Sequence, residues 1–264
     1  MTAGEFTRIR VDWHDGVTSV VLDRPHRRNA IDLELARELL EAALMERTAA
    51  SRCVVLSGEG GHFCVGGDLK SFRDEPDLPG HLLAVTTYLH AAMTRLATLP
   101  APLVVAARGH VAGAGLGLAC LADVLLVEEG STFRSAYAAL GLSPDAATSY
   151  LLPRLVGLRR ARRMTHLGYV LEAKEAVEWG LCTEWVPAGG LAERARAVAA
   201  QLAAGPTRAF GQTARLLDAA WRRTLVEHLD DEATTLSTTA ATADAREGIA
   251  AFVERRAAEF GGRE

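Results

Sequence analysis

Residues 63–70 read Phe63-Cys64-Val65-Gly66-Gly67-Asp68-Leu69-Lys70, and residues 109–117 read Gly109-His110-Val111-Ala112-Gly113-Ala114-Gly115-Leu116-Gly117. Each of these two glycine loops follows an apolar segment typical of a buried strand and precedes residues with helical spacing. Glycine lets a ligand approach the main chain closely, and backbone N–H groups at the start of a helix carry a partial positive charge. Two such loops facing each other predict an oxyanion hole, in which N–H groups polarise a carbonyl oxygen.

Each glycine loop has a simpler alternative interpretation. A single loop of this kind is more often a turn that allows close helix packing. A dinucleotide-binding fingerprint is also conceivable, because Gly113 and Gly115 match its first two glycines. Its third glycine position is Leu118, and no acidic residue that ends a following strand fits the ribose-binding role. The sequence therefore argues against a dinucleotide site.

Strand and helix patterns alternate on both sides of the loops. The expected elements are a hairpin over 9–22 that turns at Asp15-Gly16, a helix over 33–44 that Asp32 caps, a strand over 53–56, a helix over 82–99, a strand over 103–107, a helix over 116–121 and a strand over 124–127. Such alternation predicts an α/β fold whose ligands bind beyond the carboxyl ends of the strands.

The carboxyl-terminal part of the chain is expected to be helical. Strand patterns stop at about residue 188, and helical spacing continues over 190–204, 206–222 and 224–256. We therefore predict two parts, a core over 1–188 that carries the site and a helical region over 189–264. This helical region contains little proline or glycine, so we expect it to pack on the core or on a neighbouring subunit.

Composition restricts the partners of the protein. The 264 residues are 49% hydrophobic, which is ample for a buried core, but no apolar run approaches the roughly 20 residues that span a bilayer. Residues 1–10 show no secretory signal, so we expect a cytoplasmic protein without a membrane partner. A formal charge of −4 provides no polycationic surface for nucleic acid. Four widely spaced cysteines predict reduced thiols and no metal site.

Further motifs occur before and after the two loops. They are Arg24-Pro25 followed by Asn29-Ala30-Ile31, Leu140-Gly141-Leu142-Ser143-Pro144-Asp145, Leu152-Pro153-Arg154-Leu155-Val156-Gly157, and a segment with Ala173, Ala176, Trp179, Gly180 and Leu181. Together with the first loop, which resembles the pattern F-x-A-G-x-D-L with Val65 at the alanine position, they resemble the enoyl-CoA hydratase/isomerase (crotonase) superfamily. The resemblance extends over about residues 17–252.

This resemblance implies a spiral of ββα units with a carboxyl-terminal helical trimerisation region, assembled as a homotrimer or a dimer of trimers. It also implies an isomerase or lyase of fatty acid metabolism that acts on acyl-CoA thioesters. Coenzyme A would enter as part of the substrate, and no separate cofactor is expected. In the family, the residue between the glycine and the aspartate of the pattern F-x-A-G-x-D-L donates one oxyanion N–H. That residue corresponds to Gly67, and the second donor corresponds to Ala114.

The resemblance also suggests where coenzyme A would lie. The implied contacts are Arg24, Arg27, Arg28 and Ala30, with adenine near Val65, Gly66, Asp68 and Leu69 and a phosphate near Lys70. Arginine and lysine suit phosphate oxygens by charge and geometry. Arg27 and Arg28 could equally belong to a solvated loop.

The pair of glutamates with which hydratases of the family activate water is missing. The corresponding positions hold Gly117 and Tyr137, and the carboxylate that remains in this region is Asp145. Asp145 could simply cap the helix that follows it. Family members that shift a carbon–carbon double bond can use one carboxylate here, because one base can remove a proton and return it at another carbon. We therefore expect an enoyl-CoA double-bond isomerase with Asp145 as its sole acid/base.

Two other functions stay open. Residues 145–150 also resemble 4-chlorobenzoyl-CoA dehalogenase, in which the matching aspartate attacks an aromatic ring and His90 falls at the position of the base. The aromatic walls of that enzyme would be reduced here, because Gly67 and Tyr137 replace its Phe and Trp. His90 could instead be an ordinary polar residue of its helix. The third possibility is an inert CoA-binding trimer that kept the fold and lost catalysis.

Overall fold

The main sheet of the protein has six strands, in the order β1-β2-β3-β4-β6-β9, in a computed structural model that describes residues 6–261. The strands are β1 (Ile9–His14), β2 (Val17–Leu22), β3 (Cys53–Gly58), β4 (Leu103–Ala107), β6 (Val124–Glu128) and β9 (Glu184–Val186). The expected hairpin is confirmed, since β1 pairs antiparallel with β2. The remaining pairs are parallel, so their carboxyl ends meet at one edge.

A second sheet is small and was not predicted from the sequence. Its three strands are β5 (His110–Ala112), β7 (Thr132–Arg134) and β8 (Leu171–Glu172), in that order. Strands of two or three residues are too short to show an alternating pattern. The small sheet nevertheless places the second glycine loop, because β5 leads directly into α5 (Ala114–Cys120).

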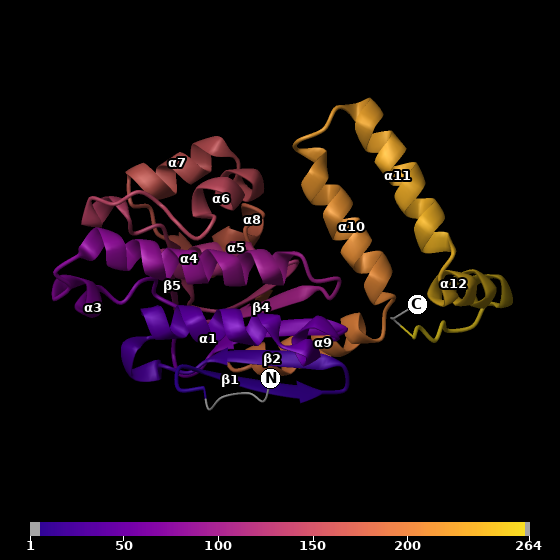
Figure 1. The fold of residues 1–264 in the computed structure, drawn as a ribbon, viewed down its shortest axis with the longest axis horizontal. Coiled ribbons are helices and arrows are strands. Elements are labelled where there is room, and N and C mark those ends of the chain that lie inside the picture. Colours follow the sequence, from indigo (N-terminus) through magenta and orange to yellow (C-terminus); the bar gives the residue numbers. More distant parts are fainter. Residues whose placement is uncertain (1–5, 262–264) are drawn as a thin grey trace.

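The two faces of the main sheet are covered by different helices. α1 (Leu33–Leu44) and α4 (Leu78–Ala97) lie side by side over one face, and α9 (Leu191–Ala203) covers the other (Figure 1). Successive residues of β4 alternate between the faces, as strand geometry requires. Val105 packs in the core with α1 and α4, whereas Val104 and Ala106 pack with α9.

Shorter helices connect the strands and the longer helices. They are α2 (Glu46–Ala49), α3 (Leu69–Arg73), α6 (Thr148–Val156), α7 (Leu158–His166) and α8 (Ala173–Glu178), with single 3₁₀ turns at Pro25–Arg27 and Ala138–Leu140. Helix α3 begins directly after the first glycine loop, and Asp68 caps it by accepting a hydrogen bond from the Lys70 N–H.

The last three helices extend away from the core. In Figure 1, α10 (Thr207–Ala220) and α11 (Leu225–Ala240) run side by side, and α12 (Ala243–Glu254) follows at the far end. The single helix expected over 224–256 is therefore wrong. Thr242 is extended and accepts a hydrogen bond from the Ala245 N–H, so it ends α11 and caps α12.

These three helices expose large apolar side chains. Leu217, Trp221, Leu225, Leu236, Phe252 and Val253 are each at least 66% exposed. Among the helices of residues 6–261, none combines the length and the apolar character needed to cross a membrane.

Candidate active site

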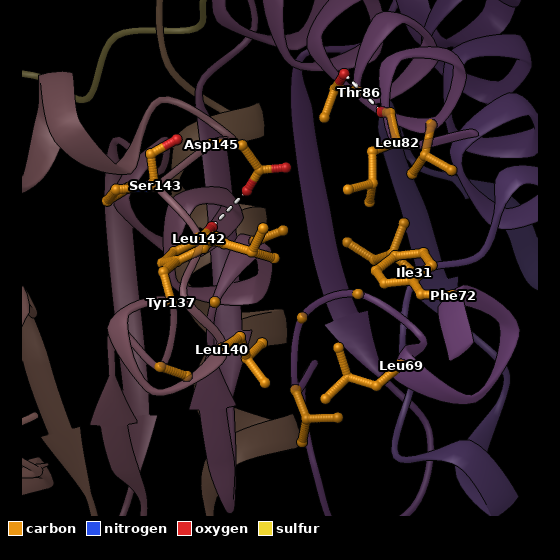
Figure 2. Close-up of a pocket in the computed structure, with 18 of the residues that line it drawn as sticks. Ile31, Leu69, Phe72, Leu82, Thr86, Tyr137, Leu140, Leu142, Ser143 and Asp145 are labelled. Carbon is orange, nitrogen blue, oxygen red and sulfur yellow. Dashed lines mark hydrogen bonds between the residues drawn. The ribbon is translucent and has the colours of Figure 1, made fainter. Parts of the chain in front are cut away.

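A cavity of about 440 Å³ opens between the two glycine loops, α4 and the segment 134–145 (Figure 2). Its walls are mainly apolar and include Ile31, Val65, Leu69, Phe72, Leu82, Val85, Leu89, Leu140 and Leu142. Asp145 is the one carboxylate among the described residues that line it. The cavity therefore combines an apolar interior with a single acidic side chain.

The two glycine loops touch through their main chains. The Ala112 N–H donates to the Cys64 carbonyl at 3.0 Å, which joins the second loop to the first. A Cβ on Gly66, whose φ is +94°, would lie 3.3 Å from the Ala114 nitrogen. Glycine at this position allows both the left-handed conformation and the close approach. The facing loops that the sequence predicted are thus present.

Gly67 and Ala114 contribute backbone N–H groups at this junction, and both residues line the cavity. Within the described chain, neither N–H donates a hydrogen bond to another protein group. The adjacent amides are used, since Asp68 donates to Ile31 and Gly113 donates to Arg134. Two unpaired amides in one cavity can together bind an oxygen that carries negative charge.

The side chain of Asp145 is held by Tyr137, which lies beside it on the same wall (Figure 2). The Tyr137 hydroxyl donates a short hydrogen bond to Asp145 Oδ1 (Figure 2). Burial of the phenol, followed by the nearby Asp145 carboxylate, raises the pKa of Tyr137 well above its usual value. Tyr137 therefore keeps its proton at neutral pH and acts as a donor.

The carboxylate of Asp145 does not cap α6 among the residues described. That helix begins after Ala147 without a side-chain cap, and the Thr148 N–H donates to the main-chain carbonyl of Asp145. The side chain instead lines the cavity with Tyr137. The structure therefore gives no support to a capping role.

The turn after Asp145 has an unusual backbone. Ala146 and Ala147 both have positive φ angles, +47° and +55°, which are unfavourable for residues with a side chain. The Ala146 N–H donates to Nε2 of His90 on α4, at 3.1 Å. His90 is therefore placed behind the turn and is not among the residues that line the cavity.

Gly117, one of the two positions that lack the family's glutamate, packs against the same turn. A Cβ on Gly117 would lie 2.0 Å from the Ala146 oxygen and 2.8 Å from the Ala146 Cβ. The turn that carries Asp145 thus fills the space that a side chain at position 117 would need. The missing glutamate is visible in the sequence, whereas no local pattern indicates this contact.

Phe72 is a further residue that the sequence did not single out. It lines the cavity from α3, and a Cβ on Gly67 would lie 2.6 Å from Phe72 Cε2. The ring therefore occupies the space beside one of the two free amides.

The residues expected to bind coenzyme A fall into three groups. Val65, Gly66 and Leu69 line the cavity, while Arg28 and Lys70 are exposed and Arg27 is half-buried. Arg24 is buried and bonded to other protein groups: its guanidinium donates to the Ala30 carbonyl and pairs with Asp68 at 3.0 Å and Asp32 at 3.1 Å. Arg24 therefore joins the first glycine loop to Asp32 and Ala30. Contacts with coenzyme A itself stay predictions.

Comparison with known proteins assigns the family. The family model described as enoyl-CoA hydratase/isomerase matches residues 12–263. The chain belongs to this family. The family acts on acyl-CoA thioesters. The activities named for its members indicate that this chain is an isomerase or a lyase. As expected, the fold matches solved crotonase-type structures: a Mycobacterium abscessus protein described as an enoyl-CoA hydratase/isomerase is 37% identical with a TM-score of 0.91, over 97% of this chain and 100% of that one.

Curated crotonase relatives catalyse different reactions. The 1,2-epoxyphenylacetyl-CoA isomerase of Escherichia coli is 36% identical over 94% of this chain and 96% of its own. The 4-chlorobenzoyl coenzyme A dehalogenase-2 of an Arthrobacter species is 33% identical over 80% of this chain and 78% of its own. Membership of the family therefore does not determine which reaction this site catalyses.

Proposed function

We propose that the protein is an enoyl-CoA double-bond isomerase in which Asp145 is the sole acid/base. The observation that carries this proposal is the presence of one carboxylate, Asp145, in a cavity that also contains the unpaired amides of Gly67 and Ala114. Water activation by two glutamates is unavailable, because position 117 has no room for a side chain and position 137 holds a tyrosine. The isomerase name of the E. coli relative agrees with this choice.

In the proposed reaction the thioester oxygen of a 3-enoyl-CoA binds between the two amides. The Asp145 carboxylate removes a proton from carbon 2, and the C–H electrons form a dienolate whose charge the amides stabilise. Protonated Asp145 then returns the proton to carbon 4, which leaves the double bond between carbons 2 and 3. Tyr137 keeps the carboxylate oriented between these steps, and no second base is needed.

Separate incubations with a 3-enoyl-CoA, a 2-enoyl-CoA and 4-chlorobenzoyl-CoA test this proposal, with products followed by chromatography. We expect conversion of the 3-enoyl to the 2-enoyl thioester and no 3-hydroxyacyl product. Hydration at a comparable rate would contradict the proposal. Binding of the enoyl thioesters without any turnover would favour the inert CoA-binding trimer.

Dehalogenation is the second candidate, because Asp145 could attack an aromatic ring and an Arthrobacter dehalogenase is among the relatives. In that reaction His90 would serve as the base. Its Nε2 already accepts the Ala146 N–H, which leaves that nitrogen without a free lone pair. Release of chloride from 4-chlorobenzoyl-CoA, with no isomerisation of either enoyl thioester, would establish this function in place of ours.

We also propose that the chain assembles as a homotrimer or as a dimer of trimers. The support is the apolar side chains that α10, α11 and α12 expose, since a monomer rarely leaves so many large apolar groups in water. Sedimentation equilibrium should give a multiple of three chains. Phe252→Glu should weaken the assembly, whereas Glu254→Gln on the same helix should not. A stable monomer of the parent protein would refute the proposed assembly.

A further inference from the structure

The main-chain amide of Ala146 depends on a side chain from another helix. Ala146 is fully buried, and among the described residues its N–H has one acceptor, Nε2 of His90, at 3.1 Å. A buried N–H without an acceptor is costly, so this contact stabilises the position of the turn. Asp145 is the residue immediately before it, and its carboxylate orientation depends on that position.

The turn needs such support because of its backbone. Two consecutive alanines adopt left-handed φ angles, and this conformation costs roughly 1–2 kcal/mol for each residue that has a Cβ. Gly117 leaves room for the turn but has no side chain that could support it. A strained turn persists only where its surroundings hold it in place.

A backbone amide can only donate, so the geometry also fixes the state of the imidazole. Nε2 must be unprotonated to accept the Ala146 N–H, and the proton of neutral His90 must then be on Nδ1. A histidine in this state cannot use Nε2 as a general base without releasing the turn. The imidazole is thus suited to hold the main chain and unsuited to transfer protons.

We propose that His90 is a positioning residue: its hydrogen bond stabilises the strained turn at Ala146 and Ala147 and thereby holds Asp145 in its reactive orientation. The effect on turnover rests on the isomerase function proposed above. The stabilisation of the turn by His90 concerns only the protein and can be tested without substrate.

The substrate-free test is hydrogen exchange, measured by mass spectrometry on peptides that cover residues 143–150. His90→Leu keeps a side chain of similar bulk but removes the acceptor. We expect it to speed exchange in this segment about tenfold, as loss of one buried hydrogen bond would. His90→Gln should preserve protection, because its amide oxygen can accept the same N–H. Unchanged exchange in His90→Leu would show that His90 does not stabilise the turn, whether or not the protein is an isomerase.

The kinetic test separates positioning from proton transfer. His90→Leu should lower kcat about tenfold with little change in KM, while His90→Gln should lose less than about threefold. Ala147→Gly should restore kcat when combined with His90→Leu, because glycine adopts the left-handed conformation without strain. Equal inactivation by Leu and Gln, with no rescue by glycine, would show that the imidazole itself transfers protons and would overturn the proposal.

Discussion

The carbonyl oxygen of Ala146 lies 2.0 Å from the point at which a side chain on Gly117 would begin. The turn after Asp145 and a side chain at position 117 therefore exclude each other. The absence of one glutamate and the presence of Asp145 in this cavity are two aspects of the same arrangement.

Gly117→Ala should accordingly destabilise the protein and displace the turn. Overpacking of a buried site costs about 1–3 kcal/mol, so we expect a loss of that size in the free energy of unfolding. Gly61→Ala is the matched control, because nothing lies within 4 Å of its Cβ position. Both are measured by denaturant unfolding. Gly117→Glu should not produce hydratase activity, and its appearance would disprove the steric argument.

Asp145→Asn should fold and bind ligand but lose turnover. The amide has the same size as the carboxyl group but cannot carry the proton, so kcat should fall by about 10² to 10⁴. Binding of a saturated acyl-CoA, measured by calorimetry, should stay within a few-fold of the parent. An Asn variant with near-parental kcat would exclude Asp145 as the acid/base.

Tyr137→Phe removes one hydroxyl and keeps the ring. The carboxylate of Asp145 then loses the hydrogen bond that orients it, so kcat should fall about tenfold with little change in KM. Because the raised pKa of Tyr137 keeps the phenol protonated, the basic limb of the pH–rate profile should not change in this variant. The check is a pH–rate profile of both proteins with one 3-enoyl-CoA. An unchanged kcat would mean that the hydrogen bond has no effect on the base.

Gly67 and Phe72 should behave as a coupled pair. Gly67→Ala alone places a methyl group 2.6 Å from the Phe72 ring and should lower stability by about 1–3 kcal/mol. In a Phe72→Leu background the same change should cost less than about 1 kcal/mol, because the shorter side chain leaves space. A double-mutant cycle measured by denaturant unfolding gives the coupling energy. Additive effects would show that the ring moves away freely.

The four cysteines should resist modification while the protein is folded. All four are buried, and burial raises the pKa of the Cys53, Cys64 and Cys120 thiols to about 12. The thiolate, which is the reactive form, is therefore scarce at pH 8. Mass spectrometry after iodoacetamide treatment should show no adduct in the native protein and four after denaturation. Rapid labelling of the native protein would indicate an opening of the core.

Much of the fold and part of the site could be predicted from the sequence, because those features depend on local patterns. Main-chain N–H groups, glycine loops and a lone carboxylate are visible in the residues themselves. The contacts of Gly117 with Ala146 and of His90 with the same residue join distant segments. No periodicity or motif carries information about such contacts.

Arg24 has contacts within the protein that no motif reveals. Arginine suits phosphate, and the sequence does not reveal that Asp32 and Asp68 already bind this guanidinium. The short strands β5, β7, β8 and β9 were likewise not predicted, because two or three residues cannot display a period. Tertiary contacts decide such features, and local patterns do not.

The two unpaired amides belong to the main chain, and this has an evolutionary consequence. Every residue except proline supplies an N–H, so any substitution at Gly67 or Ala114 that the surrounding side chains accommodate would keep the donor. Acidic side chains, in contrast, can be lost or gained by one nucleotide change. A lineage can therefore alter the side chains around the cavity while it inherits the same pair of donor amides.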